Sequence, residues 1–133
     1  MNPVRREQGR HVVYVVEADA GVRDGLCRLL RSAGLDTRPF GAIEELSTAP
    51  EPSESGCILL DISAPAAAAP GFHDELRRIG LPSIALSARR DATMRRRARE
   101  LGSQFFLGKP VDDQALLDAI EWVIEGSHSG APG

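Results

Sequence analysis

The chain has 133 residues, of which 42% are hydrophobic and 26% charged, and its net charge is −3. This length suffices for one domain with a hydrophobic core, and so small a charge favours neither nucleic acid nor a membrane surface as a partner. No apolar run approaches the roughly 18 residues that span a bilayer. Cys27 and Cys57 lie inside apolar patterns without metal-ligand spacing, which predicts two buried free thiols and a cytoplasmic protein.

Short apolar runs alternate with segments of helical periodicity along the chain. The second of these runs, residues 35–40, has alternating polarity and contains Pro39, which is typical of an edge strand. Asp19, Asp91 and either Asp112 or Asp113 stand where helix N-caps are expected, while Gly34 supplies a stop signal. The pattern predicts strands at 11–16, 35–40, 56–61, 81–87 and 103–108, with helices near 22–33, 42–47, 72–79, 92–101 and 114–125.

Strands that alternate with helices through short loops indicate an α/β fold with a parallel sheet covered on both faces. We predict one domain over residues 11–126. The polar residues 1–10 carry no signal-peptide core and are expected to form a flexible N-terminal arm. Residues 127–133 are expected to form a flexible tail.

Four of the five predicted strands end in, or are followed directly by, a polar side chain: Glu17, Asp61, Ser87 and Lys109. The carboxyl ends of parallel strands meet at one edge of the sheet, where ligands bind. Lys109 is the single lysine among sixteen basic residues, so this position calls for a reason specific to lysine. A carboxylate can accept a phosphoryl group, a second acid can share a hard cation with it, and an ammonium can contact a phosphate oxygen. The sequence therefore predicts a phosphoryl site centred on Asp61.

These residues resemble the receiver domains of two-component response regulators over about residues 11–125. The run that ends at Asp61, with Pro65 four residues later, is similar to the phosphoacceptor motif. Ser87 followed by Ala88 resembles the hydroxyl switch of the family. The pair Lys109-Pro110 resembles its lysine and the following cis proline, and Phe106 falls at its aromatic switch position.

The resemblance implies a flavodoxin-like (βα)5 three-layer sandwich with a five-stranded parallel sheet of order 2-1-3-4-5. It also implies that Asp61 accepts phosphate from a sensor histidine kinase, with Lys109 contacting the phosphate. The domain would act without enzymatic activity beyond slow self-dephosphorylation. The fourth helix, fifth strand and fifth helix would then signal to an effector domain, a partner protein or a second copy in a homodimer. Residues 111–120 are similar to nitrogen-fixation and nodulation regulators, which carry a helix-turn-helix effector.

The acidic pair of the family is incomplete in this sequence. Glu17 matches the first acid, but Ala18 stands at the second, which supplies a metal ligand in the family. The resemblance implies Mg²⁺ held by Glu17, Asp61 and the backbone carbonyl of Ser63, and the methyl group of Ala18 predicts weakened binding. The loop after Asp61 also departs from the family, with alanines at positions 64 and 66–69.

Two alternatives remain open at the level of sequence. A degenerate receiver would act as a protein-interaction module without phosphorylation. A small α/β phosphatase could use Asp61 as nucleophile, but Ser63 stands where such an enzyme needs a second acid. The arginines between residues 89 and 99 favour the solvated face of a helix over a nucleic-acid patch, and an acidic protein is the partner such a face would suit.

Overall fold

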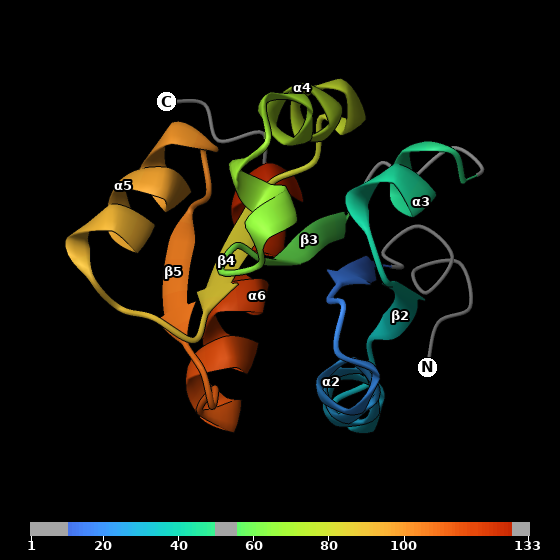
Figure 1. Ribbon diagram of the computed structural model, residues 1–133. Coiled ribbons are helices and arrows are strands. Elements are labelled where there is room, and N and C mark those ends of the chain that lie inside the picture. The colour runs from blue at the N-terminus through green and yellow to red at the C-terminus, as the bar shows by residue number, and fades with distance from the viewer. Residues whose placement is uncertain (1–10, 50–55, 129–133) are drawn as a thin grey trace.

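The computed structural model describes residues 11–49 and 56–128. Five parallel strands form one sheet in the order β2-β1-β3-β4-β5, as predicted (Figure 1). The strand that contains Pro39 lies at an edge of the sheet, also as predicted. The strands are β1 (Val12–Val16), β2 (Asp36–Phe40), β3 (Gly56–Asp61), β4 (Ser83–Ser87) and β5 (Phe105–Gly108).

Helices cover both faces of the sheet (Figure 1). On one face pack α2 (Ala20–Ser32) and α6 (Asp113–His128). On the other face pack α3 (Ile43–Ser47), the 3-10 helix η1 (Pro65–Ala68), α4 (Pro70–Ile79) and α5 (Ala92–Glu100). The result is the predicted three-layer sandwich.

The central strands alternate between two hydrophobic cores because successive side chains point to opposite faces. Leu59 of β3 belongs to the core beneath α2 and α6, and Leu60 belongs to the core beneath α3, α4 and α5. Both side chains are fully buried. This double coverage explains why β1 and β3 read as continuous apolar runs instead of alternating ones.

Several element boundaries differ from prediction by a few residues. β4 begins at Ser83 because Pro82, which was predicted inside the strand, has no N–H to donate to a neighbouring strand. Residues 62–71, between the predicted strand at 56–61 and the predicted helix near 72–79, contain η1 and the first two residues of α4. Both helices begin with a proline, which fits the first helical turn because its missing N–H is not needed there.

The described residues begin directly after the predicted arm and extend into the predicted tail. The predicted arm, residues 1–10, lies outside the described residues. The last helix runs to His128, two residues into the segment predicted as a tail. Gly126 lies within this helix, where a glycine costs roughly 1 kcal/mol. Burial of Val123 and Ile124 in the core offsets that cost. In the ranges 11–49 and 56–128 no helix is both long and apolar enough to cross a membrane.

Both cysteines are free and buried, as predicted. Burial raises the pKa of Cys57 to about 12, so its reactive thiolate is scarce at neutral pH. We expect the folded protein to show no reaction with an aromatic disulfide reagent at pH 8. In guanidinium chloride both thiols should react at once. Fast reaction of either thiol in the folded protein would contradict this expectation.

Candidate functional site

The carboxyl edge of the sheet brings three of the predicted site residues together. Lys109 follows β5, and its Nζ lies 2.7 Å from Glu17 Oε1 and 3.5 Å from Asp61 Oδ1. The three side chains are only 3% exposed for Glu17, 9% for Asp61 and 17% for Lys109. One ammonium therefore bridges two largely buried carboxylates that come from neighbouring strands.

Asp61 is held in place by the residue two positions after it. Its Oδ1 accepts hydrogen bonds from the backbone N–H of Ser63 at 3.0 Å and from the Ser63 hydroxyl at 2.7 Å. The same hydroxyl accepts a long hydrogen bond of 3.4 Å from the N–H of Ala88. Ser63 thus connects the end of β3 to the loop after β4, and no described residue donates to Oδ2 of Asp61.

The turn after β1 determines what surrounds Glu17. Asp19 caps α2, since its Oδ1 accepts from the N–H of Val22 at 3.0 Å. The N–H of Asp19 donates to Glu17 Oε2 at 3.1 Å. The carboxylate of Asp19 is therefore directed to the helix, as predicted, and does not replace the acid that is missing at Ala18.

Lys109 is charged in this environment. Burial by itself would lower its pKa, but the hydrogen bond to Glu17 and the charges of Asp61 and Glu17 outweigh that effect and raise the pKa above its ordinary value. The backbone N–H of Lys109 also donates to the carbonyl of Ser87 at 2.9 Å, which fixes the start of the side chain. The peptide bond between Lys109 and Pro110 is cis, as the resemblance implied.

Ser87 and Phe106 lie nearby but take no part in the ion-paired cluster. The fully buried Ser87 accepts a hydrogen bond from the N–H of Arg89 at 3.0 Å. Phe106 is partly buried against the core beneath α3, α4 and α5. The guanidinium carbon of Arg95 lies 5.4 Å from the centre of the Phe106 ring, in the geometry of a cation–π contact.

The residues at this edge fit a divalent cation only in part. Glu17 and Asp61 supply two carboxylates, and the carbonyl of Ser63 could supply a third oxygen. Mg²⁺ takes six oxygen ligands, usually one or two carboxylates with several waters. No set of three or more His, Cys, Asp or Glu side chains suited to a metal ion occurs in the described part of the chain.

The structure adds residues that sequence reasoning missed. The Ser63 hydroxyl could have been anticipated, because serine two residues after an aspartate often bonds locally. Arg97 donates to the carbonyl of Ile62 at 3.2 Å and so ties α5 to the loop after Asp61. The guanidinium of Arg90 lies so close to Gly108 that a Cβ there would collide with it. The contacts of Arg97 and Arg90 join segments that are distant in the sequence, so no local sequence pattern predicts them.

The fold and the site together define a small α/β protein with a lysine-bridged acidic pocket at the carboxyl edge of its sheet. The family model for the response regulator receiver domain matches residues 13–121. The chain belongs to this family, whose members are receiver domains in phosphorelay signal transduction. Receiver domains are generally non-enzymatic signalling domains, bind Mg²⁺ at an acidic pocket, and interact with histidine kinases and with effectors or partners.

Individual relatives agree with this assignment. Nodulation protein W of Bradyrhizobium diazoefficiens is 36% identical over 124 residues, which cover 86% of this chain and 55% of that protein. Transcriptional regulatory protein TdiR of Thauera aromatica is 38% identical over 110 residues, which cover 81% of this chain and 48% of that protein. The chain thus spans about half the length of the curated relatives it matches.

Solved structures agree as well. The response regulator StyR matches with a TM-score of 0.76 and 35% identity, over 90% of this chain and 62% of that one. A receiver protein from Pseudoalteromonas atlantica matches with a TM-score of 0.73 and 20% identity, over 87% of this chain and 98% of that one. The second likeness supports the fold alone.

Proposed function

We propose that Asp61 is the phosphoacceptor of this receiver domain and takes its phosphoryl group from a sensor histidine kinase. The observation that carries the proposal is the position of Lys109, whose ammonium bridges Asp61 and Glu17 at the carboxyl edge of the sheet. A cation so placed can neutralise an oxygen of the incoming phosphoryl group. Asp61 retains partial solvent exposure, so a donor can reach it.

The available oxygen of Asp61 suggests the direction of attack. Oδ1 is occupied by the two hydrogen bonds from Ser63 and the ammonium of Lys109, whereas Oδ2 accepts from none of the residues in 11–49 and 56–128. In the transfer, Oδ2 would form a bond to phosphorus as the bond between phosphorus and the kinase imidazole nitrogen breaks. The product is an aspartyl phosphate, and the electron pair of the broken bond leaves with the imidazole.

We propose that Mg²⁺ binds this pocket weakly, held by Glu17, Asp61 and the carbonyl of Ser63. When bound, such a cation offsets repulsion between the carboxylates and the phosphoryl oxygens. Ala18 contributes no carboxylate, and Asp19 is committed to the cap of α2. The chain's own cation, Lys109, therefore supplies a larger share of the positive charge than it would beside a complete acidic pair.

The signalling surface is proposed to be the face made by α5, β5 and α6. Ser87, which binds the backbone of the loop before α5, would move its hydroxyl toward the phosphate, and Phe106 would respond from the neighbouring strand. Trp122 of α6 is 62% exposed and meets Phe105 of β5 edge to face, with ring centres 5.5 Å apart. A large exposed aromatic ring of this kind is typical of a protein interface.

The partner on this face is proposed to be an effector region or a separate effector protein, with a second copy as a further option. Two of the relatives are named as transcriptional regulatory proteins, TdiR and FixJ, and each is about twice as long as the segment it shares with this chain. Control of transcription is accordingly the output that we propose. Contact with nucleic acid is proposed to belong to that effector and not to this domain, whose net charge is −3.

Incubation with acetyl phosphate and Mg²⁺ tests the phosphoacceptor assignment. Intact-mass spectrometry should show one added phosphate, and Asp61→Asn should abolish the adduct because an amide oxygen is a far weaker nucleophile. Asp74→Asn is a matched control on the exposed surface of α4 and should retain the adduct. Absence of an adduct at every Mg²⁺ concentration, or its persistence in Asp61→Asn, would refute the assignment and leave a phosphorylation-independent interaction module.

A further inference from the structure

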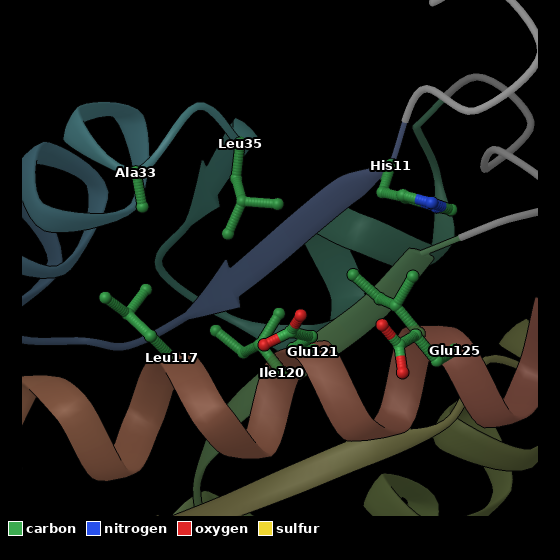
Figure 2. A pocket seen from close by; sticks show the side chains of 8 residues that line it. His11, Ala33, Leu35, Leu117, Ile120, Glu121 and Glu125 are labelled. Atoms are coloured by element: carbon green, nitrogen blue, oxygen red, sulfur yellow. The ribbon is translucent and has the colours of Figure 1, made fainter. Parts of the chain in front are cut away.

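A cavity of about 360 Å³ opens between the end of α2, the beginnings of β1 and β2, and one side of α6. It lies at the amino ends of the strands, whereas Asp61 and Lys109 lie at the carboxyl ends. Figure 2 shows side chains from these separate elements around one space. The lining residues are His11, Ala33, Leu35, Leu117, Ile120, Glu121, Ile124 and Glu125.

The inner wall of the cavity is apolar. Ile120 and Ile124 are 1% and 6% exposed and belong to the core beneath α2 and α6. Leu35 and Leu117 pack against the same core and are only partly buried. A ligand in the cavity would cover the remaining apolar surface of these side chains, and such burial favours binding by roughly 25 cal/mol per Å².

The outer wall of the cavity carries negative charge. Glu121 and Glu125 are exposed and stand one helical turn apart on α6, on the side that faces β1 in Figure 2. None of the ion pairs found among residues 11–49 and 56–128 involves either carboxylate. Two like charges at this spacing repel each other, and a cation between them relieves that repulsion.

We propose that this cavity binds a small amphiphilic cation, with a compact hydrocarbon or aromatic body and one ammonium group. The volume falls within the range of small-molecule sites, roughly 300–1,000 Å³. The body would lie against Leu35, Ile120 and Ile124, and the ammonium would lie between the carboxylates of Glu121 and Glu125. The site is separate from Asp61, so its failure would leave the proposed phosphoacceptor function untouched.

The probe for this site is 2-phenylethylammonium, titrated into the ¹⁵N-labelled full chain and followed by amide chemical shifts. We expect saturable shifts confined to the residues around the cavity. Neutral 2-phenylethanol should bind about fivefold more weakly, and anionic 3-phenylpropanoate more weakly still, because an exposed ion pair contributes up to about 1 kcal/mol, a factor of about five.

Two variants test the two halves of the site. Glu121→Gln with Glu125→Gln should weaken binding of the cation about fivefold and leave binding of the neutral alcohol unchanged. Ala33→Leu, which enlarges an exposed lining residue, should weaken binding of both molecules by filling the cavity. Glu100→Gln is the matched control, since this exposed acid on α5 does not line the cavity. The urea midpoint of each variant reports whether its fold is intact.

Two outcomes would overturn the proposal. The first is no saturable shift up to roughly 10 mM probe, an affinity weaker than about 3 kcal/mol. The second is equal binding of the cation and the alcohol with no dependence on Glu121 and Glu125.

Discussion

Replacement of Lys109 by methionine is expected to lower the free energy of unfolding by about 3 kcal/mol at pH 7. The change removes the ammonium that bridges Glu17 and Asp61, and methionine keeps most of the side-chain volume. Loss of one partner from a buried ion pair typically costs 3–5 kcal/mol because the remaining charge stays buried without compensation. The lower end applies here because Lys109 is partly exposed.

Urea unfolding followed by circular dichroism measures this loss, with Arg96→Met as the matched control. Arg96 is an exposed cation on α5, and its replacement should change stability by less than about 0.5 kcal/mol. Glu17→Gln combined with Lys109→Met should recover part of the loss, since one uncompensated carboxylate is then gone. A loss below about 1 kcal/mol in Lys109→Met would mean that water already screens the cluster.

The contribution of Lys109 to the free energy of unfolding should also depend on pH. A lysine whose pKa is raised in the folded state stabilises the protein fully below its unfolded pKa of about 10.4, and that contribution disappears as the pH rises through the folded pKa. The stability difference between the native protein and Lys109→Met should therefore stay constant near neutrality and shrink above about pH 10.4. A difference that shrinks already near pH 8 would contradict the raised pKa.

Ala18→Asp is expected to raise the affinity for Mg²⁺ by at least about tenfold. A carboxylate at this exposed position would add a direct oxygen ligand beside Glu17 and Asp61. Even partners outside the first ligand layer change metal affinity by roughly 10- to 100-fold, so a direct ligand should matter at least as much. Phosphorylation by acetyl phosphate should then reach completion at a correspondingly lower Mg²⁺ concentration.

Isothermal titration calorimetry with Mg²⁺ measures this gain. Ala20→Asp adds the same charge two residues further along, at the first position of α2, and controls for net electrostatic attraction. It should leave the affinity within about twofold of the native protein, because an exposed charge that is not a direct ligand attracts the ion only weakly through water. Equal gains in both variants would show that charge alone limits binding, and no gain in Ala18→Asp would show that the missing acid is not the defect.

The sequence by itself determined the fold class and the carboxyl ends of the strands. Continuous apolar runs are typical of strands buried on both faces, and their alternation with helical periodicity leaves a parallel doubly wound sheet as the natural outcome. The glycine that follows α2 and the aspartates that cap α2, α5 and α6 were readable for the same reason, because each acts on its immediate neighbours. Local rules also placed Glu17, Asp61 and Lys109 at one edge of the sheet.

Tertiary structure alone decided how those residues meet. The ammonium of Lys109 contacts Glu17 across a sequence separation of 92 residues, and no local pattern sets that distance. The bond from Arg97 to Ile62 and the cavity beside Glu121 and Glu125 arise in the same way, from elements that only packing brings together. Sequence periodicity specifies which face of an element is buried. Which side chains then come into contact depends on how the two layers of helices pack against the sheet.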